Sequence, residues 1–213
     1  MPRWRSFGRL IGGAAFFLLG GTTAATLSVA RQPAHPAAAR AVDAATPSAN
    51  RIEVSPAAMR QALAAGQIDR PVKSVLQVPA RMQYGDFKWD DAGVPAGPLW
   101  IRVDTRAQLI SVFRAGHEIG TAVILYGADG LETPAGKFPI LAKLKDHHSA
   151  TYDAPMPYTL RLTKDGVAIH ASDVRWGLAT HGCVGVPEGF AKQLFAAASV
   201  GDEVFVVGNP KRA

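Results

Sequence analysis

The chain has 213 residues, of which 48% are hydrophobic and 19% are charged. That length suits one medium-sized domain with accessory segments, and the hydrophobic share is large enough to build a buried core. Lysine and arginine number 23 against 17 aspartate and glutamate residues, so the net charge is only +6. Because the sequence also has no basic run with interleaved aromatic residues, we expect no nucleic-acid partner.

The N-terminal residues have the parts of an export signal. Arg3, Arg5 and Arg9 precede an uncharged run over residues 10–30, which ends in the small-x-small triplet Ser-Val-Ala. These parts are typical of a secretory signal peptide. The run also has about the length, roughly 20 residues, of a membrane-spanning helix. We therefore expect export to the periplasm or cell envelope. Residues 1–30 are then either a cleaved signal or a retained anchor in which residues 10–30 contact the membrane.

The next segments are a linker and an N-terminal extension. Residues 31–50 are rich in alanine and proline, which predicts a flexible tether. Residues 51–98 form a helical and irregular extension, in which Ser55 as an N-cap and Pro56 at the first helical position predict a short helix over residues 56–65. The rest of this extension contains one predicted strand, in VKSVLQVP, and one predicted loop, DFKWDDAGVPAGP.

Residues 99–208 have the pattern of a mostly-β domain. Short runs rich in β-branched residues are separated by turn residues, which predicts strands. The runs are LWIRVDT, QLISVFRAG, EIGTAVILYG, GKFPIL, TLRLT, GVAIH and DEVFVVG. The stretch KDHHSATYD is interpreted as a loop, and PEGFAKQLFAAAS as a helix that begins near Pro187. Many short strands with one or two short helices predict a β-sandwich-like mixed sheet.

The only cysteine, Cys183, lies in the sequence ATHGCVGVP. A nucleophilic thiol must lose its proton before or as it attacks, and a histidine within hydrogen-bonding reach can take that proton. His170 ends a predicted strand, which is a rigid position for a base. His181 is so close in sequence that its ring can point away from the sulfur, so we predict it as a supporting group. Gly182 permits a tight turn in which the N–H groups of Gly182 and Cys183 would stabilise an oxyanion.

Two other interpretations of Cys183 stay open at this point. The thiol can be a simple core residue, since a lone cysteine forms no internal disulfide. Cys183, His170 and His181 are also side chains of the kinds that bind zinc. Against zinc, the local spacing is H-x-C, and His147 and His148, being adjacent, would point in different directions on a strand.

The same part of the chain resembles the L,D-transpeptidases of bacterial cell-wall synthesis. The resemblance runs from residue 99 to residue 207 and has four parts in the family's order. They are the opening hairpins LWIRVDTRAQLISVFRAGHEIGTAVILYG, the T-P-x-G motif as TPAG, the M-P-Y/F motif as MPY, and the distant IH followed by THGCV. The last part is specific, and the weaker parts gain weight from their order.

The resemblance implies the roles of the reacting groups. Cys183 would be the acyl-enzyme nucleophile and His170 its base. The base would be oriented by the backbone carbonyl of Ala171, and the N–H groups of Gly182 and Cys183 would form the oxyanion hole. The fold implied is a β-sandwich-like mixed sheet with a helix near the site, which agrees with the strand pattern.

The resemblance also implies the residues around the substrate. His181 and Thr180 would shape the pocket, and Tyr158 would lie near the donor stem peptide. Two positions depart from the family's pattern. Gly185 stands where the family usually has arginine or asparagine, a residue linked to substrate binding. Ala171 stands where a glycine usually follows the first histidine.

The function implied is that of a peptidoglycan L,D-transpeptidase that needs no metal or organic cofactor. Cys183 would attack the carbonyl between the third residue and the terminal D-Ala of a tetrapeptide stem, releasing D-Ala and leaving a thioester. An amine would then take the acyl group, giving a 3→3 cross-link or a related exchange. Carbapenem-type β-lactams would acylate the same thiol. Two alternatives stay open: an L,D-carboxypeptidase that uses the same cysteine, and a catalytically idle peptidoglycan-binding protein.

Overall fold

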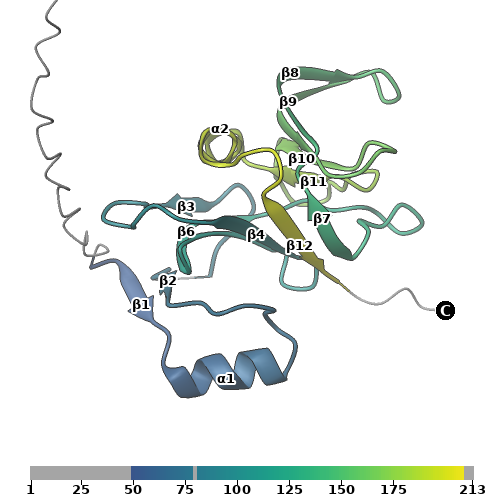
Figure 1. Cartoon of the computed structure of the whole chain (residues 1–213). Coiled ribbons are helices and arrows are strands. Elements are labelled where there is room, and N and C mark those ends of the chain that lie inside the picture. The colour runs from purple at the N-terminus through teal and green to yellow at the C-terminus, as the bar shows by residue number, and fades with distance from the viewer. Residues whose placement is uncertain (1–48, 79–80, 209–213) are drawn as a thin grey trace, which may run out of the picture. The chain divides into compact units, whose positions relative to one another are not determined.

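The strands of the protein form two sheets (Figure 1). The computed structural model describes residues 49–78 and 81–208, all within one compact unit of the chain. The predicted export segment and residues 31–48 of the predicted linker lie outside the described residues. The large sheet contains β1 (Arg51–Glu53), β2 (Ser74–Leu76), β3 (Phe87–Trp89), β4 (Leu99–Asp104), β5 (Leu109–Arg114), β6 (His117–Val123), β7 (Gly136–Pro139) and β12 (Glu203–Val207). The smaller sheet contains β8 (Ala142–Ser149), β9 (Ala154–Arg161), β10 (Ala168–Ala171) and β11 (Val184–Val186), and the helices are α1 (Pro56–Ala64) and α2 (Glu188–Ala197).

The order of the strands confirms the predicted mixed-sheet fold class. In the large sheet the order is β1-β2-β6-β5-β4-β12-β7, with β3 also paired to β6, and in the smaller sheet it is β11-β10-β9-β8. Tight turns create the antiparallel β4-β5-β6 meander. Asp104 Oδ1 accepts hydrogen bonds of 3.0 Å from the N–H groups of Arg106 and Ala107 after β4. The turn after β5 has φ values of 51° at Ala115 and 89° at Gly116, as two-residue hairpins prefer.

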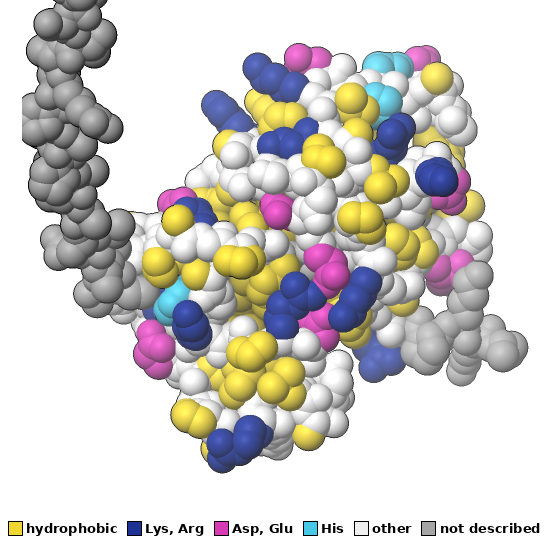
Figure 2. All heavy atoms as spheres, viewed as in Figure 1, with side chains coloured by type: hydrophobic (Ala, Val, Ile, Leu, Met, Phe, Trp, Pro, Cys, Tyr) yellow, Lys and Arg dark blue, Asp and Glu magenta, His cyan; other side chains and the backbone are white. Residues whose placement is uncertain are grey.

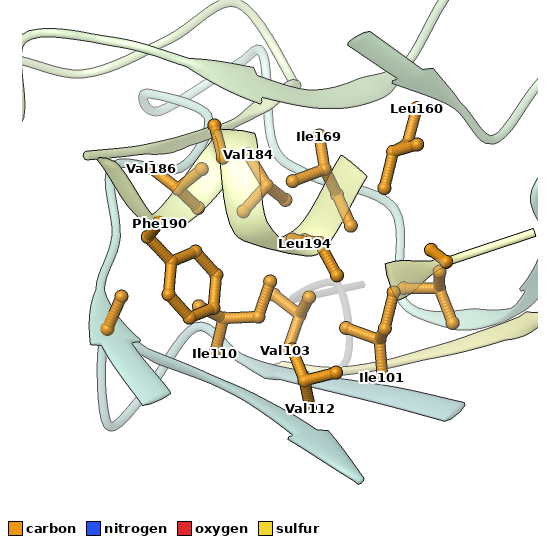
Figure 3. Close-up of a cluster of buried hydrophobic side chains, with 14 of the residues drawn as sticks. Ile101, Val103, Ile110, Val112, Leu160, Ile169, Val184, Val186, Phe190 and Leu194 are labelled. Carbon is orange, nitrogen blue, oxygen red and sulfur yellow. The ribbon is translucent and has the colours of Figure 1, made fainter. Parts of the chain in front are cut away.

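Helix α2 lies between the two sheets. Figure 3 shows Phe190 and Leu194 of α2 between side chains of β10 and β11 on one side and side chains of β4 and β5 on the other. Both side chains are fully buried, and burying a residue as large as Phe190 stabilises the fold by roughly 1.5–3 kcal/mol. Trp89 of β3 packs edge-on against Phe190 at 5.5 Å between ring centroids. This core holds β10 and β11, the strands next to the predicted site residues, in fixed positions.

The two predicted helices are confirmed. Helix α1 begins after Ser55, whose Oγ accepts a hydrogen bond of 3.2 Å from the N–H of Ala58, and Pro56 occupies its first turn. Helix α2 begins directly after Pro187. In residues 49–78 and 81–208, no helix has the length and apolar character that crossing a membrane requires.

Two stretches predicted as loops contain strands, so these predictions were wrong. DFKWDDAGVPAGP includes β3, which pairs antiparallel with β6. KDHHSATYD includes the second half of β8, so His147 and His148 lie on a strand that pairs with β9. Both strands depend on a neighbour far along the chain, and neither has the alternating β-branched pattern that identifies a strand locally.

The N-terminal extension covers the outer face of the large sheet, which is the face opposite α2. Trp100 of β4 and Phe113 of β5 stack there with ring centroids 4.2 Å apart. Met59 of α1 and Ile68 pack against this pair, and together they form a small hydrophobic cluster separate from the main core. Three strands of the extension, β1, β2 and β3, also pair within the large sheet.

Ion pairs hold the extension to the end of the large sheet. Basic and acidic side chains are intermixed on the face shown in Figure 2. Asp69 pairs with Arg70 at 3.0 Å and with Lys137 of β7 at 2.7 Å, and Arg70 also pairs with Glu203 of β12. The hydrogen bond from Arg70, helped by Lys137, lowers the pKa of Asp69 to about 2. The ionised Asp69 therefore stabilises the fold at pH values above the ordinary aspartate pKa. This contribution is lost as the pH falls through the lowered pKa.

Candidate active site

Cys183 and His170 lie on neighbouring segments of the smaller sheet. Strands β10 and β11 pair in parallel, with His170 opposite Gly185. Extended back to the residue before β11, this register places Cys183 opposite Ala168, whose backbone N–H is hydrogen-bonded to the sulfur. Because side chains alternate between the faces of a strand, Cys183 and His170 are diagonal neighbours on one face. The fold therefore brings together the residues predicted as nucleophile and base.

The thiol of Cys183 is half-buried. Its Sγ lies 3.9 Å from the carbonyl oxygen of Gly166, in the turn before β10. Burial raises the pKa of Cys183, and the hydrogen bond from the N–H of Ala168 opposes part of that rise. The thiol is therefore protonated at neutral pH, and it needs a base in order to become a nucleophile.

The imidazole of His170 is held in one orientation. Its Nδ1 lies 2.8 Å from the carbonyl oxygen of Ala171, so Nδ1–H donates to that carbonyl and the lone pair is on Nε2. Ser172 Oγ is 3.4 Å from the same nitrogen. Burial lowers the pKa of His170, the bond to Ala171 opposes this shift, and the charge of His147 on β8 adds to it. His170 is therefore a neutral imidazole at neutral pH, which is the form that accepts a proton.

The pKa directions predict how the reactivity of the thiol depends on pH. Since the pKa of Cys183 is raised and the pKa of His170 is lowered, the resting pair is a neutral thiol and a neutral imidazole rather than a thiolate and an imidazolium. We expect the alkylation rate of Cys183 by iodoacetamide to rise continuously from about pH 6 to beyond the ordinary thiol pKa of about 8.5. Intact-mass kinetics measure this rate. A plateau already reached near pH 6–7 would show a preformed ion pair instead.

Two threonine hydroxyls hold the backbone at Cys183. Thr180 Oγ1 donates a hydrogen bond of 2.6 Å to the carbonyl oxygen of Cys183, and Thr133 Oγ1 lies 3.5 Å from the same oxygen. Thr133 also accepts from the N–H of Gly127 at 3.0 Å. The N–H of Thr180 is bonded to the carbonyl of Tyr126 at 2.9 Å. The TPAG motif thus contributes Thr133 to the support of the cysteine turn, a role that the sequence did not reveal.

Glycine is required at two places in this turn and its support. Gly182 has a φ of 109°, which places it in a region that residues with side chains rarely adopt. Gly127 allows a close backbone approach, because a Cβ there would lie 2.0 Å from the carbonyl oxygen of Leu131. The conformation of the buried Gly182 therefore sets the direction of the N–H groups of Gly182 and Cys183, as an oxyanion hole at this turn would need.

His181 lies at the surface against the tip of the β8–β9 hairpin. Its ring stacks on that of Tyr152, with centroids 4.4 Å apart and an angle of 19° between the planes. Tyr152 was not identified from the sequence, which holds no local sign that this hairpin meets the cysteine turn. Among residues 49–78 and 81–208, no three His, Cys, Asp or Glu side chains are grouped to hold a metal ion, the combination of Cys183, His170 and His181 included.

Tyr158, predicted to lie near the donor stem, packs toward the core. It belongs to β9, and its ring contacts that of Phe195 of α2 edge-on, with 5.8 Å between centroids. Its φ of 57° is unusual for a residue with a side chain. Its predicted contact with the donor stem stays a prediction.

Gly185 is surrounded by neighbouring atoms, and Ser172 fills the space beside it. A Cβ at Gly185 would lie 2.7 Å from Ser172 Oγ and 2.9 Å from Ser172 Cβ, which is closer than real Cβ contacts. Gly185 is also held through both of its backbone groups, because its N–H and carbonyl are bonded to those of Leu125 at 2.9 Å. The departure from arginine or asparagine at this position is therefore matched by a serine that occupies the neighbouring space.

This packing predicts a coupled effect of two substitutions. Gly185→Asn alone should lower the free energy of unfolding by about 1–3 kcal/mol, as overpacking of a tight site does. Combining it with Ser172→Gly should recover much of that loss, because the clashing side chain is removed. Thermal or denaturant unfolding of the two single variants and the double variant measures the coupling. If the loss of stability in the double variant equals the sum of the losses in the two single variants, Ser172 does not restrict position 185.

Comparisons with known proteins concern the part of the chain that contains this site. A family model described as the L,D-transpeptidase catalytic domain (YkuD) matches residues 98–206, more than half of the chain. An L,D-transpeptidase from Stackebrandtia nassauensis is similar in structure, with 25% identity, a TM-score of 0.50, and coverage of 56% of this chain and 60% of that chain. One from Mycobacterium smegmatis has 23% identity, a TM-score of 0.47, and coverage of 51% and 58%. A mutant L,D-transpeptidase from Enterococcus faecium has 26% identity and a TM-score of 0.47, with coverage of 55% of this chain and 52% of that chain.

The match to the family model establishes the family. The chain belongs to the L,D-transpeptidase catalytic-domain family, which confirms the resemblance inferred from THGCV and the motifs before it. The matched region contains both Cys183 and His170. The chain spans less than two thirds of the length of each of these three solved chains. The comparison with curated proteins gave no match.

Proposed function

We propose that the protein is a peptidoglycan L,D-transpeptidase in which Cys183 is the nucleophile and His170 is the base. The observation that carries this proposal is the arrangement of the pair on one face of β10 and β11. The carbonyl of Ala171 holds Nδ1 of His170, so Nε2 is the nitrogen that takes a proton. The protonated, half-buried thiol suits a reaction in which the proton leaves as the substrate is attacked.

The first step forms the acyl-enzyme. Sγ of Cys183 bonds to the carbonyl carbon between the third residue of a stem peptide, a diamino acid, and the fourth, D-Ala. The thiol proton passes to Nε2 of His170, and the N–H groups at Gly182 and Cys183 donate to the oxyanion. The C–N bond then breaks, and the proton on His170 passes to the amine of the departing D-Ala. A thioester remains on Cys183.

The second step transfers the acyl group. The amine of a second stem attacks the thioester carbonyl and gives a proton to His170. The C–S bond breaks, and the sulfur takes back a proton. The product is a 3→3 cross-link, or an exchanged stem when the acceptor is a free D-amino acid. A thioester retains enough acyl reactivity for an amine acceptor, which explains why a thiol serves in this reaction.

Product analysis tests the proposal. The purified protein is incubated with a diaminopimelate-containing tetrapeptide stem, and products are followed by mass spectrometry with Cys183→Ala as control. We expect cysteine-dependent release of D-Ala together with stem dimers. Release of D-Ala without dimers would show an L,D-carboxypeptidase, in which water resolves the thioester. No reaction with any stem would support the idle peptidoglycan-binding alternative.

The same acylation predicts covalent inhibition by a carbapenem. Attack of Cys183 on the β-lactam carbonyl opens the ring, and because both parts of the opened ring stay connected, the adduct adds the whole mass of the drug. We expect complete one-to-one labelling of the wild-type chain and none of Cys183→Ala by intact-mass spectrometry. An unmodified wild-type mass after long incubation would contradict an accessible, activated thiol.

We also propose that the protein works in the cell envelope, where its substrate lies. This proposal rests on the sequence of residues 1–30, with three arginines before an uncharged run. Fractionation of cells that express the tagged chain tests it, and the mass of the recovered protein distinguishes a cleaved signal from a retained anchor. Recovery of an uncleaved chain from the cytosol would contradict the proposal.

A further inference from the structure

A cavity of 890 Å³ lies on the outer face of the large sheet, and neither Cys183 nor His170 lines it. Side chains of β5 and β6 that point away from the main core form its floor. Val75, Leu76, Val78 and residues 81–84 of the N-terminal extension form a wall, and Trp176 stands at its side. Side chains of both small hydrophobic clusters of this face line the cavity, Val75 from one and Met82, Tyr84, Leu109 and Val123 from the other. The catalytic-domain strands and the extension therefore build it together.

Beyond the paired apolar side chains of Leu109 and Val123, the floor of the cavity is polar. Ser111 of β5 and Thr121 of β6 are directly paired across the two strands. Glu118 is only 6% exposed, its Oε2 accepts a hydrogen bond of 2.8 Å from the N–H of Leu76, and Ser111 is hydrogen-bonded to it. Burial raises the pKa of Glu118, so its carboxyl holds a proton more readily than an ordinary glutamate does. The floor thus offers hydroxyl and carboxyl groups that suit an uncharged, hydrogen-bonding ligand.

Two aromatic residues stand at one side of the cavity. Trp176 packs edge-on to Tyr84, with 5.8 Å between ring centroids, and the Tyr84 hydroxyl is bonded to Gln108 Oε1 at 3.2 Å. Trp176 is 82% exposed, although tryptophan usually buries most of its large apolar surface. The ring face of Trp176 is therefore free to receive the apolar face of a ligand.

The combination of a polar floor and an exposed indole restricts the ligand. A flat hydrocarbon would displace water from the hydroxyl and carboxyl groups of the floor without offering them a hydrogen bond, which is costly. Among the described residues, Arg81 and Glu118 are the only charged side chains that line the cavity, so a strongly charged peptide would find few partners of opposite charge. A sugar ring meets both conditions, because one face carries C–H groups and its edge carries hydroxyl or acetamide groups.

We propose that this cavity binds the sugar chain of the substrate polymer, an N-acetylated amino-sugar chain. The pyranose face lies against Trp176, and the hydroxyl and acetamide groups reach Ser111, Thr121 and Glu118. The inference rests on the proposed function, since peptidoglycan stems are attached to such a chain. Trp176 belongs to the loop between β10 and β11, which joins His170 to Cys183. The cavity and the reacting pair therefore share one segment of the chain.

A binding experiment on a catalytically inactive chain tests the inference. The full chain with Cys183→Ala is titrated with a chito-oligosaccharide of four N-acetylglucosamine units by calorimetry. We expect saturable binding that Trp176→Ala weakens about tenfold, as loss of an aromatic contact does. Leu178→Ala is the matched control, because Leu178 lies in the same loop, is exposed and does not line the cavity. It should bind like the parent. Melting curves of each variant confirm that the fold is kept, which the exposure of Trp176 leads us to expect.

The outcomes separate this inference from the proposed function. Absence of saturable sugar binding, or equal binding by Trp176→Ala, would overturn the inference even if the wild-type chain cross-links stems. Tryptophan-dependent sugar binding in a chain that turns over no stem would support the cavity and contradict the transpeptidase. A sugar-free stem peptide that binds with the same dependence on Trp176 would show that the cavity takes peptide, and would also overturn the inference.

Discussion

Replacing Cys183 by alanine should abolish D-Ala release while leaving the fold intact. In the proposed mechanism the thiol supplies the only bond that holds the acyl group between the two steps, so we expect turnover to fall by at least about 10³-fold. The substitution removes a single half-buried sulfur, and the turn around it is held by backbone and threonine contacts that alanine leaves in place. The free energy of unfolding should therefore change by less than about 1.5 kcal/mol. Stem turnover and denaturant unfolding measure the two effects.

The control for this variant is a change of similar size near the same turn. Thr180→Ser keeps the hydroxyl that donates to the Cys183 carbonyl, so it should retain most of the activity and bind stem in the same way. Residual turnover by Cys183→Ala close to that of the wild type would rule out the thiol as nucleophile. A large loss of stability in the same variant would instead indicate that Cys183 is mainly a core residue.

The motif and the hairpins of the catalytic domain were predictable because their signals are local. Cys183 and His170 were identified from side-chain chemistry and from the end of the run GVAIH. The parallel β10–β11 register then shows why residues thirteen positions apart lie on one face: Cys183 directly precedes β11, and His170 lies on the neighbouring strand β10. The β4-β5-β6 meander was likewise visible, because each strand alternates and each turn has its own sequence.

Other parts of the site depend on contacts that no local pattern encodes. Strand β3 is three residues long and is stabilised by pairing with β6 and by the contact of Trp89 with Phe190. Tyr152 stacks on His181 only because the β8–β9 hairpin extends to the cysteine turn. These contacts join residues from distant parts of the chain, and single-sequence patterns do not report such pairs.

The contact between Ser172 and Gly185 is another feature that the sequence could not predict. In the sequence, Gly185 stands where the family usually has arginine or asparagine, which raises a doubt about substrate binding. In the structure, the position has no room for a side chain, because Ser172 occupies the space beside it. The glycine at position 185 is therefore partly explained by packing against Ser172. Its effect on substrate binding is best tested in a variant with both residues changed.

Replacing His170 by glutamine should slow acylation far more than replacing His181 by glutamine. In the proposed mechanism His170 takes the thiol proton, so its loss should cost about 10²–10⁴-fold in the rate of D-Ala release. The glutamine amide can still donate to the Ala171 carbonyl, which helps to keep the local fold. His181 is exposed and stacked on Tyr152 rather than directed by a hydrogen bond of this kind. Its replacement should cost less than about tenfold, chiefly through weaker positioning of substrate.

The pH dependence distinguishes a lost base from a damaged site. In the wild-type chain, the rate of stem acylation should fall on the acidic side as His170 becomes protonated, and because burial lowers its pKa this fall should occur below the ordinary histidine pKa of about 6.5. His170→Gln should lose that acidic limb and regain rate only as the pH approaches the raised pKa of Cys183. His181→Gln should keep the acidic limb with a lower plateau. If His181→Gln removes the limb and His170→Gln keeps it, the two histidines have the opposite roles, and His181 is the base.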